Sequence, residues 1–254
     1  MKLFILLILA PWASYAQEVF LRDVPVRTEI LYQTVFNMKF ERDKQYMKYS
    51  SVLQTEGSRS VFYMLPGKSE NSMTESEMTI ELDTMFRVEK NLQEESMVFS
   101  DINLTGKESY YRDSIHPMQW KLTQDVKWID SLECHKAETM FRGRKYTAWY
   151  CPAIPVPNGP WKLGGLPGLI IEAYEDNRDL YFMLSSLRNV SNVSSNAMHL
   201  RPPEKYSPYP VFQQYWREMS KRMQASLSAQ DASECVNCLS RSKVKLYSWE
   251  VIPD

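Results

Sequence analysis

The chain has 254 residues with 30 basic and 31 acidic side chains, and 44% of its residues are hydrophobic. This balance of charge excludes the basic face of a nucleic-acid-binding protein, and no cluster of lysine and arginine compensates for it. Charged residues are interspersed with apolar ones, which excludes an intrinsically disordered chain and is typical of a folded domain.

The N-terminal residues predict an export signal over residues 1–16. A short basic start is followed by the apolar run 3–10, and small residues stand before a cut after Ala16. This is the pattern of a secretory signal peptide, with Gln17 as the mature N-terminus. A helix of that run spans about 12 Å, against about 30 Å of hydrocarbon, so no membrane span is predicted. We expect residues 17–254 to form one domain in the periplasm or outside the cell.

Alternation of apolar and polar residues predicts strands along most of the chain. In residues 28–41 the apolar side chains stand mainly at even positions and the polar ones mainly at odd positions. Because successive side chains of a strand point to opposite faces, one face meets a core and the other meets water. Weaker runs of the same kind occupy residues 58–65, 79–88, 180–187 and 244–252. The sequence therefore predicts a mainly β fold, a curved antiparallel sheet that forms a sandwich or an open barrel.

Residues 118–129 repeat this alternation clearly. Their apolar face consists of Trp120, Leu122, Val126 and Trp128. The opposite face carries lysine, threonine and aspartate. We expect the apolar set to pack into the core of the sheet.

Residues 133–151 predict a hairpin with an Arg-Gly turn at 142–143. In that register Cys134 stands directly opposite Cys151. The two form a non-hydrogen-bonded pair, whose Cα atoms approach to about 4.5 Å, a separation that a disulfide accepts. An oxidising compartment favours the bond. Arg-Gly is a weaker turn than Asn-Gly, and a bulged loop would shift the register by one residue.

The next segment, residues 152–171, contains five prolines and four glycines. Proline fixes φ and removes a donor, whereas glycine permits positive φ, so this segment cannot form a regular strand. It is either a structural crossover packed by Trp161, Leu163 and Leu166, or the lip of a binding site. No helix pattern follows to provide an N-terminal dipole for a phosphate, which favours the structural interpretation.

Residues 211–229 predict an amphipathic helix near the C-terminus. Its apolar stripe consists of Phe212, Tyr215, Trp216, Met219, Met223 and Leu227. Pro208 and Pro210 precede it, as is common where a helix starts. The stripe could bind a partner or a membrane. Since a helix needs a buried face for stability, we expect it to pack on the sheet.

Cys235 and Cys238 form a CxxC pair that has three interpretations. A second disulfide, local or exchanged with the first pair, fits a secreted chain with four cysteines. A redox-active pair would need a helix N-terminus and a cationic neighbour, and no strand-then-helix pattern surrounds it. A metal site would combine these thiols with Cys134 or His135. We predict disulfides and leave the other two interpretations open.

No catalytic motif is recognisable. A G-x-S-x-G elbow does not occur, and the segment 65–69 lacks the earlier glycine of a phosphate loop. His116, His135 and His199 are far apart in the sequence, and the carboxylates near residues 75–83 show no paired-acid spacing. No catalytic residue, cofactor or metal is therefore predicted.

A six-residue motif resembles a known family. Gly165, Leu166, Pro167, Gly168, Leu169 and Ile170 spell the signature of the GLPGLI family (Porph_ging type) of exported proteins from Bacteroidetes-type bacteria. The flanking residues agree with it, namely 134–137, 141–144, 148–150, 154–155 and 159–162. Cys151, Cys235 and Cys238 are not part of the family pattern, so the disulfide prediction rests on geometry.

The resemblance implies export to the periplasm or beyond, genes that neighbour TonB-dependent outer-membrane transporters, and no established enzyme activity. It also implies a curved sheet wrapped against a helix, similar to periplasmic lipoprotein carriers. We therefore expect a non-enzymatic envelope protein that binds a hydrophobic or peptidic ligand, or such a transporter, in the concavity of its sheet. The alternatives are a redox- or metal-binding envelope protein that uses His135 and the cysteines, and a purely structural envelope component.

Overall fold

The computed structural model describes residues 27–40, 43–65, 67–68, 70–71, 81–82, 86–102, 108–115, 118–190 and 205–234. Several predictions lie outside these residues. They are the signal peptide with its cleavage site at Ala16 and Gln17, the strand at 244–252, His116, His199, Cys235 and Cys238.

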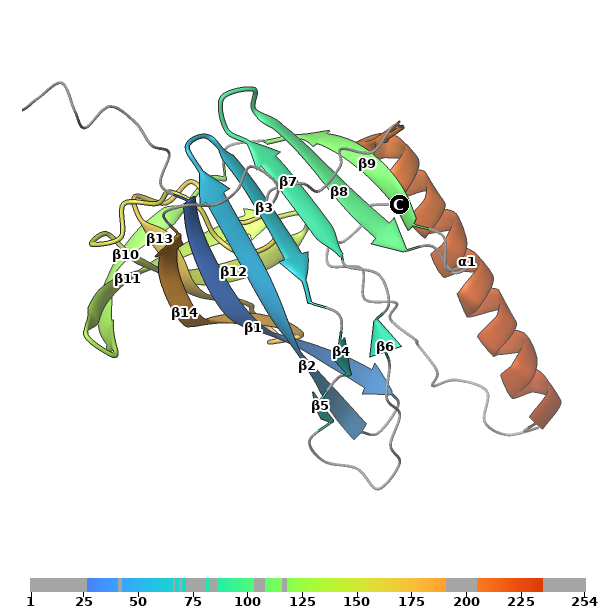
Figure 1. The fold of residues 1–254 in the computed structure, drawn as a ribbon. Helices are drawn as coiled ribbons and strands as arrows, with labels where there is room; N and C mark the ends of the chain where they lie inside the picture. The colour runs from blue at the N-terminus through green and yellow to red at the C-terminus, as the bar shows by residue number, and fades with distance from the viewer. Residues whose placement is uncertain are drawn as a thin grey trace, which may run out of the picture.

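The described residues form fifteen strands and one helix (Figure 1). The strands are β1 Arg27–Phe40, β2 Asp43–Glu56, β3 Arg59–Met64, β4 Gly67–Lys68, β5 Glu70–Asn71, β6 Glu81–Leu82, β7 Arg87–Asn91, β8 Ser96–Ile102, β9 Glu108–Ser114, β10 Lys121–Ile129, β11 Leu132–Phe141, β12 Arg144–Cys151, β13 Leu169–Glu175, β14 Leu180–Val190 and β15 Ser207–Pro208. The helix α1 spans Tyr209–Glu234.

One open sheet contains nearly all of these strands, in the order β10-β11-β12-β13-β14-β1-β2-β3-β7-β8-β9-β15. All neighbouring strands in this sheet are antiparallel except β15 and β9, which run parallel. The strand β5 pairs with β2 off this path, and β4 and β6 form a separate pair. The mainly β fold class with one C-terminal helix is therefore confirmed.

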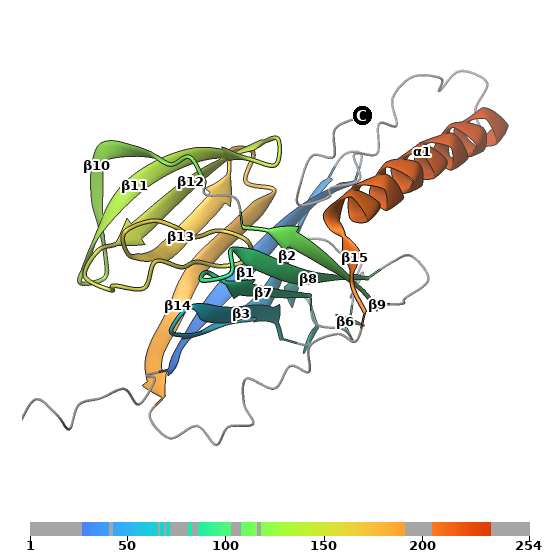
Figure 2. The same ribbon diagram turned by 90° about the horizontal axis from the view of Figure 1, so that it is seen from above.

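The sheet is strongly curved, because a short connection joins β9 and β10. These strands lie near opposite ends of the sheet order, yet only residues 115–120 separate them in the chain. In a flat sheet the two strands would be about 50 Å apart, at about 4.8 Å per strand. The connecting residues reach about 24 Å when fully extended. The two arms of the sheet must curl toward each other, as the view from above shows (Figure 2).

The core lies on the concave face of this curve. Ile30, Leu53, Phe62, Val88 and Phe99 are paired in succession from β1 to β8, and each is at most 2% exposed. Paired residues of neighbouring strands point to the same side of a sheet, so these residues form one continuous apolar row. The predicted strand at 28–41 is confirmed as β1, with Ile30 and Tyr32 buried as expected.

The predicted hairpin and its register are confirmed. β11 pairs with β12 from His135–Tyr150 to Phe141–Arg144, around a turn at 142–143. Arg142 and Gly143 have φ values of 50° and 74°, which matches a two-residue turn with positive φ at both central positions. This turn suits the twist of the strands, so the Arg-Gly sequence forms it without a bulge.

The predicted helix is confirmed as α1, which starts beside β9 and points away from the sheet (Figure 1). Its first turns pack on the sheet through Phe212, whose ring lies 5.0 Å from Phe99 and 5.2 Å from Tyr111. One turn later, Trp216 Nε1 donates a hydrogen bond to Asp101 at 2.7 Å. The apolar stripe therefore packs on the sheet at this end, as predicted. The side chains of Met223 and Leu227 lie outside the description.

Candidate functional site

The proline- and glycine-rich segment between β12 and β13, residues 152–168, is here called the inner loop. It lies between the two arms of the curved sheet (Figure 2). Its side chains Trp161, Leu163 and Leu166 are at most 1% exposed. The Trp161 ring packs against Phe141 at 5.7 Å and Tyr146 at 6.0 Å. The inner loop thus fills this part of the concavity with core, in agreement with the structural interpretation of its sequence.

Polar groups of residues that are distant in the sequence hold the backbone of the inner loop. Lys90 of β7, only 4% exposed, donates from Nζ to the carbonyl oxygens of Gly159 at 3.0 Å and Leu163 at 2.8 Å. Trp120 donates to the carbonyl of Gly164 at 2.8 Å. Burial lowers the pKa of Lys90 to about 7. A neutral amine retains two N–H donors, which is enough for the two carbonyls.

Two glycines allow the inner loop to approach its neighbours closely. A Cβ on Gly168, where φ is 150°, would lie 2.2 Å from the carbonyl oxygen of Cys151. A Cβ on Gly159 would lie 2.7 Å from Ile170 Cδ1. No residue with a Cβ atom fits at these two positions unless its neighbours move, so glycine is needed there for close packing.

A second buried lysine joins the inner loop to α1. Lys162 is 4% exposed, and its Nζ lies 3.6 Å from the ring centroid of Phe99. Tyr209 and Phe212 at the start of α1 are 5.4 and 5.7 Å from the same atom. A cation over aromatic faces is attracted by their quadrupoles. Neither Lys90 nor Lys162 was singled out from the sequence. Lys90 stands between Glu89 and Asn91, whereas Lys162 stands between the buried residues Trp161 and Leu163.

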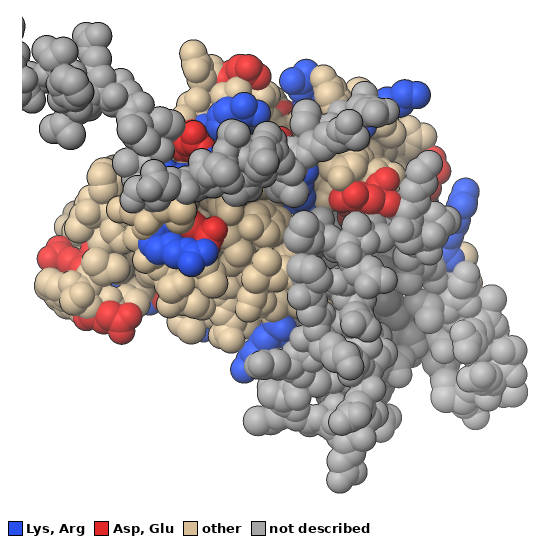
Figure 3. Space-filling model, in the orientation of Figure 1, with Lys and Arg blue, Asp and Glu red and all other residues tan. Residues whose placement is uncertain are grey.

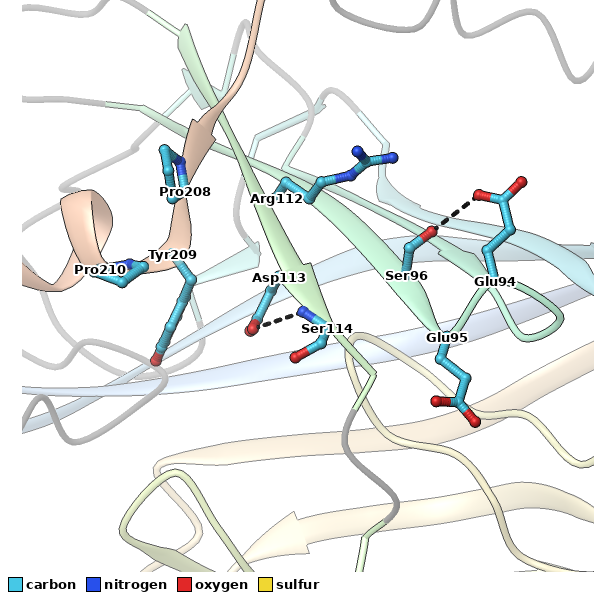
Figure 4. Close-up of a pocket in the computed structure, with 9 residues that line it drawn as sticks. All are labelled: Glu94, Glu95, Ser96, Arg112, Asp113, Ser114, Pro208, Tyr209 and Pro210. Carbon is cyan, nitrogen blue, oxygen red and sulfur yellow. Dashed lines mark hydrogen bonds between the residues drawn. The ribbon is translucent and has the colours of Figure 1, made fainter.

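A shallow pocket of about 640 Å³ opens where β8 and β9 meet the start of α1 (Figure 4). It is lined by Glu94, Glu95, Ser96, Arg112, Asp113, Ser114, Pro208, Tyr209 and Pro210. Asp113 forms an ion pair with Arg142, whose guanidinium also stacks 4.0 Å from the Tyr209 ring centroid. The lining offers charged groups of both signs but no histidine or cysteine. Its chemistry suits weak binding of a polar group rather than nucleophilic catalysis.

Cys134 and Cys151 are completely buried near the ends of the hairpin strands. Both are free thiols in this structure, so the predicted disulfide is not seen. Burial, and next the charge of Cys151, raise the pKa of Cys134 to about 11. A reactive cysteine requires a lowered pKa, so Cys134 does not suit a redox-active or nucleophilic role. The bond itself stays a prediction.

We expect this disulfide to form when a Cys235→Ser/Cys238→Ser variant is produced in an oxidising compartment and purified without reductant. Iodoacetamide in urea should add no mass until the protein is reduced, and two adducts afterwards. A further Cys134→Ser change supplies the control, because it leaves one thiol that reacts at once. If the Cys235→Ser/Cys238→Ser variant, which keeps both hairpin cysteines, gained two adducts before reduction, the prediction would be contradicted.

One predicted burial is wrong, at the end of the sheet. Leu122, Val126 and Trp128 of β10, here called the exposed strip, are 55%, 47% and 67% exposed. Leu122 pairs with the buried Ala137, and Val126 pairs with His135, so the strip lies on the concave face. β10 is the end strand of the sheet, and the inner loop packs on strands farther in. Trp120, just before β10, is partly buried against the core.

The alternative metal site, which would combine His135 or Cys134 with the CxxC thiols, is only partly within the described residues, because Cys235 and Cys238 lie outside them. His135 Nε2 lies 3.2 Å from Glu133 Oε1, and its ring packs 5.8 Å from Tyr150. No three His, Cys, Asp or Glu side chains converge as metal ligands within the described part of the chain. Charges on the face in Figure 3 are interspersed, without a broad basic patch. None of the helical residues that the structure describes forms a stretch long and apolar enough to cross a membrane.

Solved structures of another protein share a distant likeness with this chain. PNGF-II in space group P21 aligns with a TM-score of 0.48 and 14% identity over 75% of this chain and 33% of that chain. PNGF-II in space group C2 aligns with a TM-score of 0.45 and 13% identity over the same shares. The alignment thus spans about a third of PNGF-II, and at these scores it supports no inference about function.

Among curated proteins, no sequence matches the chain. The family described as "Protein of unknown function (Porph_ging)" matches residues 138–172. This segment contains most of the hairpin, the whole inner loop and the start of β13, that is, the loop that fills the concavity and the strands that flank it. The resemblance predicted from Gly165–Ile170 is thereby confirmed, and the chain carries the signature of the Porph_ging, or GLPGLI-type, family.

Proposed function

We propose that this chain is an exported, non-enzymatic envelope protein that docks a peptidic or hydrophobic partner on its exposed strip. The partner that we favour is a TonB-dependent outer-membrane transporter, for which the chain acts as an accessory. This proposal keeps the concave face as the binding surface but moves the site to the end of the sheet. The inner loop already fills the region where an enclosed ligand would lie.

The observation that supports the proposal is the exposure of Leu122, Val126 and Trp128. The paired residues of β1, β2, β3, β7 and β8 on the same face are buried, whereas these three are between 47% and 67% exposed. Apolar side chains that gather in water on one face of a protein commonly mark interaction sites. Tryptophan is also enriched among residues that dominate binding energy.

The proposal predicts that a Leu122→Ser/Trp128→Ser variant loses its partner while it keeps its fold. Tagged mature protein is incubated with envelope extract, and the recovered membrane protein is quantified for wild type and variant. We expect recovery to fall about tenfold or more, since two central contacts are removed. The thermal midpoint should change little, because exposed side chains contribute little to stability.

Met140→Ser supplies the matched control, since Met140 is 67% exposed on β11 but is paired with Lys145 on the other face. This variant should recover the partner as wild type does. Equal recovery by the strip variant and the control would contradict the proposal.

A structural envelope component is the second candidate, and the filled concavity favours it. Trp161, Leu163 and Leu166 leave little room for a ligand inside the curve. On this alternative, recovery of membrane proteins would not depend on the exposed strip.

A further inference from the structure

The edge of β10 next to the exposed strip carries backbone groups that can form hydrogen bonds. β10 pairs with β11 on one side, and no other strand among the described residues pairs with it. The outer edge of such a strand presents N–H and C=O groups that can pair with another extended chain. The strip and this edge therefore offer apolar contact and main-chain hydrogen bonds along the same strand.

The opposite face of β10 is already occupied by intramolecular contacts. Lys127 forms an ion pair with Glu172, and its Nζ lies 4.3 Å from the ring centroid of Trp149. Asp125 forms an ion pair with Lys136 at 3.1 Å. An added partner would consequently find apolar side chains on the concave side and satisfied polar ones on the other side. This difference between the faces selects for a partner with alternating apolar and polar residues.

Two other occupants fit this surface less well. A lipid surface would cover the strip but would leave the edge N–H and C=O groups facing hydrocarbon, where each costs several kcal/mol. A second copy of the chain would have to match an irregular edge, because the β10–β11 register shifts between Leu122 and Val126. Such a bulge bends the strand and hinders pairing between two rigid edges. A single flexible peptide can follow the bend.

We propose that β10 receives an extended peptide segment of the partner as an added strand, with every second side chain packed on Leu122, Val126 and Trp128. This inference rests on the proposed function and names the binding mode of the same site. The main chain of the peptide supplies affinity, and its alternating apolar residues supply specificity.

Octapeptides displayed on phage provide the test. A random library is selected on the full mature protein, and a synthetic copy of the most enriched peptide is measured by isothermal titration. We expect enriched peptides to alternate apolar and polar residues, and to bind the Leu122→Ser/Trp128→Ser variant about tenfold more weakly. Met140→Ser should bind them as wild type does.

Two N-methylated copies of that peptide make the test specific for strand pairing. In a strand, the N–H groups of alternate residues point to opposite edges, so only one set can point toward β10. Methylation of one set should weaken binding about tenfold, and methylation of the other set should change it little.

The outcomes separate this inference from the proposed function. If both methylated copies bind like the parent peptide, strand addition is overturned, whereas docking on the strip stands. If no peptide is enriched but vesicles of phosphatidylglycerol bind wild type and not the strip variant, the occupant is a lipid surface and the inference is also overturned. If wild type and strip variant enrich the same peptides equally, both proposals fail.

Discussion

Gly168→Ala is expected to destabilise the native fold strongly. The added Cβ would lie 2.2 Å from the carbonyl oxygen, and 2.7 Å from the carbonyl carbon, of Cys151. It would also lie 2.9 Å from the Cα atom of Pro152. All three are backbone atoms, so no side-chain rotation relieves the overlap. Because the inner loop fills the concavity, a shift of this backbone disturbs the core around it.

We expect the free energy of unfolding to fall by about 4 kcal/mol or more, a large fraction of the about 5–15 kcal/mol typical of a domain. Urea unfolding followed by tryptophan fluorescence measures the loss. Gly165→Ala is the control, since φ there is 82° and nothing lies within 4 Å of its Cβ. That variant should lose only about 1–2 kcal/mol from backbone strain. Similar midpoints for the two variants would show that the close approach at Gly168 does not limit stability.

Lys90→Met is expected to remove a pH dependence of stability that the wild type shows between about pH 7 and 10. The folded state releases the Lys90 proton near pH 7, because burial lowers its pKa from 10.5 to about 7. The unfolded chain keeps that proton until the ordinary lysine value. In this window the unfolded state binds more protons, so the free energy of unfolding rises with pH.

In the middle of this pH window, the free energy of unfolding of the wild type should rise by about 1.4 kcal/mol per pH unit. The Lys90→Met variant should lack this rise. Burial also raises the pKa of the Cys134 thiol from 9.0 to about 11, and that of Tyr32. Both add changes of opposite sign, the first from about pH 9, so unfolding is measured below that pH. Lys221→Met, a change at an exposed lysine of α1, is the control and should keep the wild-type slope. Parallel profiles for wild type and Lys90→Met would contradict the assignment.

The sequence by itself determined the elements that depend on local patterns. Alternation is a property of neighbouring residues, and it was sufficient for β1, β10 and the register of the hairpin around residues 142–143. It failed for β2, where the adjacent residues Val52 and Leu53 are both buried. A strand covered on both faces loses its alternation, so the pattern gives no signal.

The motif at Gly165–Ile170 was enough to predict the family, whereas the reason for its glycines needed the structure. Gly168 is explained by the backbone of Cys151, which the folded chain brings against it. The partners of Lys90 are likewise distant, since Gly159 and Leu163 lie 69 and 73 residues away in the chain. In the sequence Lys90 stands between Glu89 and Asn91, so nothing local indicates that it is buried or that two carbonyl groups accept its hydrogen bonds.

The tertiary structure alone decided which apolar residues are covered. Trp128 and Ile30 stand in equally clear alternating patterns, yet Trp128 is 67% exposed and Ile30 is fully buried. Alternation assigns a side chain to a face of the sheet, but burial depends on the position of the strand in the sheet and on the loop above it. Because β10 is an end strand and the inner loop packs farther in, the same pattern forms core at Ile30 and a candidate binding surface at Trp128.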